Sequence, residues 1–151
     1  MLLVLKIGTI KNSISVQHVA EITAELWHTP KVILDTLRND PEILRLSELF
    51  VEKQHCLFLG RGTNFPIALE GALKLKEISY IHAEGYAAGE LKHGPLALVD
   101  NDMPVVILAP KDDMLDKLKS NMEEVQARGG ELFVFADENS GIKAKDRQHV
   151  D

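Results

Sequence analysis

The chain has 151 residues, of which 45% are hydrophobic and 26% charged, a composition typical of a globular domain with a substantial core. Its formal net charge is −6, from 17 Lys and Arg against 23 Asp and Glu, and this acidic balance argues against nonspecific nucleic-acid binding. Cys56 is the only cysteine, which excludes an internal disulfide and a zinc site of paired cysteines and favours a cytoplasmic location.

The first third of the sequence predicts short helices. Residues 1–10 are apolar and look like the end of a buried helix, too short to span a bilayer and without the features of a targeting signal. Apolar residues at helical spacing predict a helix over 15–27, which Pro30 ends, and two further helices over 32–37 and 43–50. No membrane partner is expected from these segments.

From residue 55 onward, strand patterns alternate with helix patterns. Three short apolar runs predict buried strands: 55–60, 104–109 and 131–136. Residues 80–89 predict a short strand followed by a short helix, and longer helices are expected over 64–81 and 112–128, the first with Asn64 as its N-cap. This order predicts an α/β fold, with a mostly parallel sheet, helices on both faces, and ligands beyond the carboxyl ends of the strands.

The predicted helix over 64–81 carries three charged residues, Glu70, Lys74 and Glu77, on an otherwise apolar surface. At about 100° per residue, these positions fall within about 40° of one another. A helix that is apolar nearly all round is normally buried, and charges on it must be paired or face a cleft. Two interpretations stand level: exposed ion pairs around Lys74, or a carboxylate that acts as a general base.

Two further segments contain residue types that suit a binding or catalytic site. The turn at 60–62 (Gly-Arg-Gly) precedes a helix, where an anion would bind, although such glycines often serve only the turn. It is not a P-loop, because no Gly-Lys-Ser/Thr follows at the required spacing. His93 stands on a turn before Gly94-Pro95 and titrates near neutrality, so it suits proton transfer; a solvated loop histidine is the alternative.

The remaining histidines show no metal-ligand spacing and are expected to be ordinary: His18, His28, His55, His82 and His149. Cys56 lies inside a predicted strand and is expected to be an inert core residue. Trp27 is expected in the core or at an interface.

Three stretches taken together resemble one enzyme family: LFLGRG at 57–62, PIALEGALKLKEISYIHAE at 66–84 and YAAGELKHGPLAL at 86–98. They are similar to the second sugar isomerase (SIS) domain of the glucosamine-6-phosphate synthases, also called isomerizing glutamine–fructose-6-phosphate aminotransferases. The resemblance implies a three-layer αβα SIS domain over 15–151 that lacks its C-terminal strand, helix and tail. Residues 1–14 would be the end of a preceding SIS domain and a linker.

The resemblance also implies roles for four residues. Glu77 matches the base that moves a proton between C1 and C2 of the open-chain sugar, and Lys74 and Glu70 match neighbouring active-site residues. His93 matches the histidine that opens the sugar ring and reaches into the active site of a second subunit, so a homo-oligomer is expected. The family converts fructose 6-phosphate and glutamine to glucosamine 6-phosphate and glutamate, without a metal or organic cofactor.

Several parts of that family have no counterpart in this sequence. These are the glutaminase domain, the first SIS domain with its sugar-phosphate loops, and the tail whose lysine forms a Schiff base with the sugar. We therefore expect a fragment that is inactive alone. The alternatives are a noncatalytic SIS module that binds a sugar phosphate or mediates assembly, and a protein in which these charges are purely structural.

Overall fold

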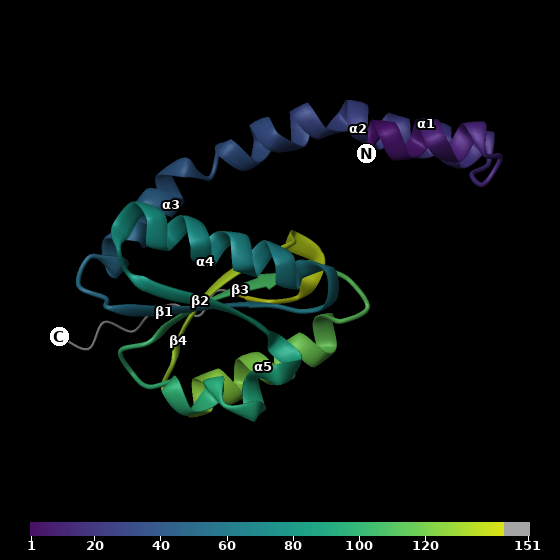
Figure 1. Cartoon of the computed structure of the whole chain (residues 1–151). Helices are drawn as coiled ribbons and strands as arrows, with labels where there is room; N and C mark the ends of the chain where they lie inside the picture. The colour runs from purple at the N-terminus through teal and green to yellow at the C-terminus, as the bar shows by residue number, and fades with distance from the viewer. Residues whose placement is uncertain (144–151) are drawn as a thin grey trace. The chain divides into compact units, whose positions relative to one another are not determined.

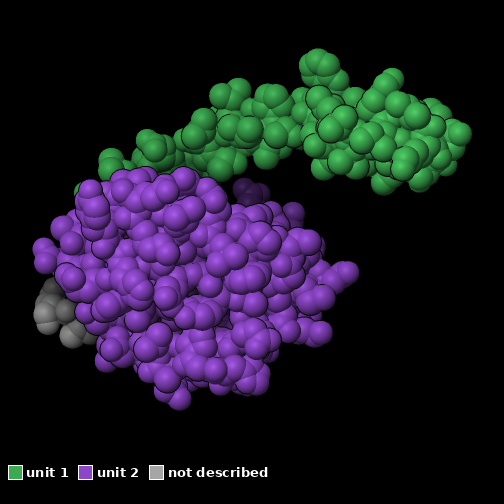
Figure 2. Space-filling model, in the orientation of Figure 1, with its two compact units in different colours: residues 1–49 green, residues 50–151 purple. Residues whose placement is uncertain are grey.

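The computed structural model describes residues 1–143, and the chain divides into two compact units, Met1–Leu49 and Phe50–Asp151 (Figure 2). This division falls at residue 49, whereas the boundary expected from the resemblance lies at residue 14; that domain assignment remains a prediction. The polar end of the chain from residue 144, with His149, lies outside the described residues.

The first unit contains three helices: α1 (Leu2–Ile10), α2 (Val16–Leu37) and α3 (Asp40–Ser47). The Ser15 side chain begins α2 by accepting a hydrogen bond from the backbone nitrogen of His18 at 3.1 Å. The predicted break at Pro30 is wrong, because α2 continues through this residue. A proline removes one backbone hydrogen bond, and the turns on either side of it remain paired. Trp27 is 82% exposed, which excludes the core position; the interface position remains a prediction.

The second unit is built on a four-stranded sheet in the order β2-β1-β3-β4, with every pair parallel. The strands are β1 (His55–Gly60), β2 (His82–Ala87), β3 (Pro104–Ala109) and β4 (Glu131–Ala136). In the register, His55 lies opposite His82, and Leu57 lies opposite both Glu84 and Val105. The predicted strands and the parallel sheet are confirmed.

Helices cover the two faces of this sheet (Figure 1). Helix α4 (Phe65–Ser79) contacts β1 and β2, whereas α5 (Leu115–Ala127) lies below the sheet against β3, β4 and a 3₁₀ segment, η3 (Ala88–His93). The predicted three-layer αβα architecture is therefore confirmed. The other 3₁₀ segments are η1 (Glu48–Phe50), η2 (Gly62–Asn64), η4 (Pro95–Leu98) and η5 (Glu138–Ser140). Among the described helices, none combines the length and apolar character needed to cross a membrane.

The main hydrophobic core lies between the sheet, α5 and η3. Its fully buried side chains are led by Leu59, Leu91, Ile107, Val105 and Val125. Leu115, Leu118 and Val125, which lie at helical spacing on α5, are part of this core. Gly129 follows α5 with φ 87°, a left-handed conformation that glycine adopts without strain.

Small residues bring α4 close to the sheet. Ala68 and Ala72 are its buried residues. A Cβ atom on Gly85 of β2 would lie 2.9 Å from the Cα of Leu69, so this position leaves no room for a side chain. The face of α4 made of small residues is therefore the face that packs against the sheet.

The expectation that α4 is buried nearly all round is wrong. Its outer flanks are exposed, by 57% at Ile67, 41% at Leu73 and 79% at Ile78. The sheet is a single layer and covers only one face of the helix. The other faces of α4 are apolar, but the described residues do not bury them.

The tight contact between α4 and β2 predicts that Gly85→Ala lowers the stability of the chain. The new methyl group would meet the backbone of Leu69, and such overpacking costs about 1–3 kcal/mol. Urea unfolding of the 151-residue chain would measure this loss as a lower free energy of unfolding. Gly89→Ala is the matched control, since its Cβ would come no closer than 3.4 Å to Arg61 and should change stability by less than about 0.5 kcal/mol. Equal stability of the two variants would contradict this packing.

The buried thiol of Cys56 gives a second prediction. Burial raises the pKa of this thiol to about 12, so almost none of it is thiolate at pH 8. A disulfide reagent such as Ellman's should label the native chain at least about a hundredfold more slowly than the chain in 8 M urea. Rapid stoichiometric labelling of the native chain would contradict this burial, because it would show that the reagent reaches the Cys56 thiol.

Candidate functional site

Helix α4 places Glu70, Lys74 and Glu77 in one group of charges on its outer surface. The Nζ of Lys74 lies 2.8 Å from Oε2 of Glu77 and 3.7 Å from Oε1 of Glu70. The spacings i,i+4 and i,i+3 bring these side chains together, as the sequence predicted. Each side chain is more than half exposed, so the group is open to solvent in the described chain.

The proton equilibrium of Lys74 limits what the group can do. The hydrogen bond to Glu77 raises the pKa of Lys74 above its usual range, and the charges of Glu77 and Glu70 add to this effect. Lys74 therefore stays a protonated ammonium at neutral pH and cannot accept a proton. Only the two carboxylates of the group can serve as a general base.

His93 lies apart from these charges within one chain. It ends η3, which follows β2 at the carboxyl edge of the sheet, and its side chain is exposed. The next residue, Gly94, has φ 146° and turns the chain into η4. Because η3 packs against α5, on the opposite side of the sheet from α4, the described chain does not bring His93 to Glu77.

The turn after β1 is explained by packing. A Cβ atom on Gly60 would lie 2.2 Å from the backbone oxygen of Asn64, so the turn needs glycine there. The Arg61 guanidinium donates to Oδ1 of Asn121 in α5 at 3.1 Å. Asn64 stands at the N-cap position of α4, as expected, but with an αR backbone (φ −85°, ψ −12°) and without a side-chain capping hydrogen bond. Its Nδ2 donates to Oδ2 of Asp112 at 3.1 Å. With a carboxylate beside the turn, the structural interpretation of the glycines is favoured over the anion site.

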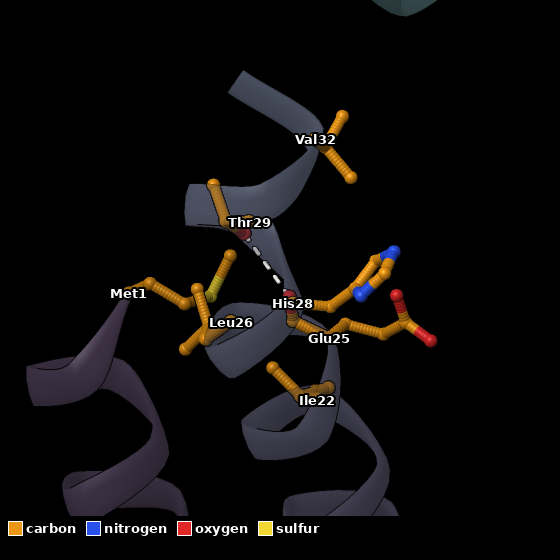
Figure 3. A pocket seen from close by; sticks show the side chains of 7 residues that line it. All are labelled: Met1, Ile22, Glu25, Leu26, His28, Thr29 and Val32. Atoms are coloured by element: carbon orange, nitrogen blue, oxygen red, sulfur yellow. Dashed lines mark hydrogen bonds between the residues drawn. The ribbon is translucent and has the colours of Figure 1, made fainter. Parts of the chain in front are cut away.

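Two pockets in the described part of the chain are lined by none of the four predicted site residues. One, of about 270 Å³, is in the first unit and is lined by Met1, Ile22, Glu25, Leu26, His28, Thr29 and Val32 (Figure 3). The other, of about 230 Å³, lies beyond the carboxyl ends of β3 and β4 and is lined by Asn64, Ile67, Leu108, Pro110, Phe135, Ala136 and Asp137. Neither of these two pockets is lined by the charged residues of α4 or by His93.

Two histidines that the sequence gave no reason to connect come together at the start of the sheet. The Nδ1 atoms of His55 and His82 lie 3.2 Å apart, and Nε2 of His82 lies 3.5 Å from Oε1 of Glu84. The hydroxyl of Tyr86 donates to Oε2 of Glu84, and this hydrogen bond raises the pKa of Tyr86. Parallel pairing of β1 with β2 creates this group, and only the strand register could have indicated it beforehand.

The sequence matches known proteins over nearly its whole length. The SIS domain family matches residues 48–150. The isomerizing glutamine–fructose-6-phosphate aminotransferase of Acinetobacter baylyi is 83% identical over 150 residues, which are 99% of this chain and 24% of that enzyme. The enzyme of the same name from Escherichia coli is 56% identical over 151 residues, again 24% of its length. The chain thus spans about a quarter of the length of these relatives.

Solved structures show the same fold. The C-terminal domain of glucosamine-fructose-6-phosphate aminotransferase from Francisella tularensis has a TM-score of 0.86 and 55% identity, over 89% of this chain and 38% of that chain. Glucosamine-6-phosphate deaminase from Thermotoga maritima has a TM-score of 0.59 and 25% identity, over 85% of this chain and 37% of that chain. The resemblance to the aminotransferase's SIS domain is confirmed. By its sequence match and its three-layer fold, this chain belongs to the SIS domain family.

Proposed function

We propose that this chain supplies part of the isomerase half of an aminotransferase that converts fructose 6-phosphate and glutamine-derived ammonia to glucosamine 6-phosphate. The observation that carries the proposal is the 83% identity, over 99% of the chain, to an isomerizing glutamine–fructose-6-phosphate aminotransferase. The ion-paired carboxylates on α4 give that similarity a chemical basis, because sugar isomerisation needs a base.

Glu77 is the proposed base. Its carboxylate takes a proton from C1 of the open-chain sugar and delivers it to C2, and negative charge develops on the sugar between these steps. The Lys74 ammonium lies 2.8 Å from Glu77, where it fixes the carboxylate and stabilises that charge. Glu70 holds the lysine from its other side, at 3.7 Å.

The exposed flanks of α4 support a site that is completed by other parts of the enzyme. Large apolar side chains border the charged group and are open to solvent: Ile67, Leu73 and Ile78. Exposed apolar side chains on both sides of a charged group are the kind of surface that an interface with another domain would cover. We place the first SIS domain and its sugar-phosphate site over this face, which would enclose the charges in a pocket closed to water.

His93 has its proposed role in another subunit. Its position across the sheet from Glu77 keeps it out of its own chain's site. In a homo-oligomer it would act on a neighbouring subunit's sugar, protonating the ring oxygen as the ring opens. The proposal therefore requires an oligomeric enzyme. We further propose that a glutaminase domain supplies the ammonia and that the enzyme is located in the cytoplasm.

The first test is Glu77→Gln, made at the equivalent position of a full-length relative such as the E. coli enzyme. Removing the base should lower the rate of glucosamine 6-phosphate formation by about 10²–10⁴-fold, because the amide cannot accept the proton. Exchange of the sugar C1 proton with deuterated solvent, followed by NMR, should fall by a similar factor.

Glu123→Gln is the control for this test, since Glu123 is an exposed carboxylate on α5, away from the proposed site. It should leave turnover unchanged. Full turnover in Glu77→Gln would reject Glu77 as the base and favour the noncatalytic alternative, in which the SIS domain only binds or assembles.

A further test uses the 151-residue chain by itself. We expect no glucosamine 6-phosphate from fructose 6-phosphate and ammonia, because the charges of α4 are solvent-exposed and His93 lies across the sheet. Product would be measured by mass spectrometry, with a full-length relative as the positive control. Product above the enzyme-free blank would refute the proposed dependence on the other domains.

A further inference from the structure

We propose that His55 and His82 form a binding site for a divalent transition-metal ion, with Zn²⁺ as the representative ion. This site is separate from the aminotransferase chemistry. It lies at the amino-terminal edge of the sheet, where β1 and β2 begin side by side. Both side chains are exposed, so an ion can reach them from solvent.

The distance between the two imidazoles suits chelation. Their Nδ1 atoms are 3.2 Å apart. Two nitrogens that bind Zn²⁺ at about 2.0–2.1 Å in tetrahedral geometry lie about 3.3–3.4 Å from each other. The rings are nearly perpendicular, at 89°, and rotation about the broad histidine χ2 torsion would turn both lone pairs toward one ion.

The backbone holds the two histidines in place before any ion binds. His55 and His82 are register partners in parallel strands, so their side chains leave the same face of the sheet. The backbone nitrogen of His82 also donates to the carbonyl oxygen of Gln54 at 3.0 Å. A chelating pair fixed in this way loses little conformational freedom on binding.

Glu84 supplies the outer partner that metal-binding histidines usually have. Its Oε1 lies 3.5 Å from Nε2 of His82, while its Oε2 is held by the hydroxyl of Tyr86. The nearby negative charge of Glu84 favours the His82 tautomer with its proton on Nε2, which leaves Nδ1 bare for an ion. His55 then donates its Nδ1 proton to His82 without metal, and shifts to the Nε2–H form when the ion binds, with no net loss of a proton.

The site offers only two protein ligands, and this number limits its expected affinity for the ion. No group of three or more His, Cys, Asp or Glu side chains in residues 1–143 is placed to hold a metal ion. Water would therefore complete the coordination shell, which makes this an open, exchangeable site. Binding should also stabilise the chain, because the ion links β1 to β2.

Titration calorimetry of the 151-residue chain with zinc chloride tests the proposal. We expect one ion per chain and a thermal midpoint that rises with zinc concentration. His55→Ala and His82→Ala should each weaken binding by about a hundredfold, because a single imidazole no longer chelates. Glu84→Gln should weaken binding by about ten- to a hundredfold.

His18→Ala is the matched control. His18 is also exposed and has a carboxylate 3.4 Å away, from Glu21, but within residues 1–143 it is not paired with a second imidazole. This variant should bind zinc as the unaltered chain does. Equal affinity in His82→Ala, or the absence of binding at millimolar zinc, would overturn the proposal.

Long-range ¹H–¹⁵N NMR of the unaltered chain gives evidence that does not depend on any variant. With zinc bound, both His55 and His82 should show the Nε2–H tautomer, with the Nδ1 resonances shifted by the metal. Shifts confined to other histidines would place the ion elsewhere and overturn the assignment.

Discussion

The close contact of α4 with β1 and β2 is the constraint on which the arrangement of this molecule depends. It exists because small residues meet there: Ala68 and Ala72 are the buried residues of the helix, and Gly85 of β2 lies against the backbone of Leu69. Interiors pack densely, and even one added methyl group at this contact has to displace backbone. The small face thus fixes the rotation of α4 about its axis, and that rotation turns Lys74 and its two carboxylates outward.

In the proposed function, the outward position of the charges lets one helix serve both folding and catalysis. Buried on α4, an ion pair would lose its hydration and would gain little net stability from its partner. The pair is exposed in this unit, so it avoids that cost while the unit folds. In our proposal, another domain then covers the pair and removes its water only when the site assembles. In our proposal, this division explains why the apolar flanks at Ile67 and Ile78 remain uncovered by the described residues.

Sequence patterns predicted the positions of helices and strands better than the burial of those elements. Strands such as His55–Gly60 and Glu131–Ala136 were located by apolar runs, and α5 by its helical period, because these signals are local. Pro30 misled the prediction, since a proline lowers helix stability without excluding a helix. Burial of α4 was also mispredicted, because apolar periodicity reports what a helix can cover and not how many layers the domain has.

The candidate site also has features that the sequence specifies and features that depend on the tertiary structure. The sequence by itself determined that Glu70, Lys74 and Glu77 meet on one helix face, because the α-helical repeat fixes their spacing. It also determined the α/β class and, through the motifs around those residues, the SIS family. Only the tertiary structure decided that η3, which ends at His93, lies across the sheet from α4 and that His55 meets His82. Strand order and register depend on the packing of residues distant in sequence, so no local pattern could specify these two positions.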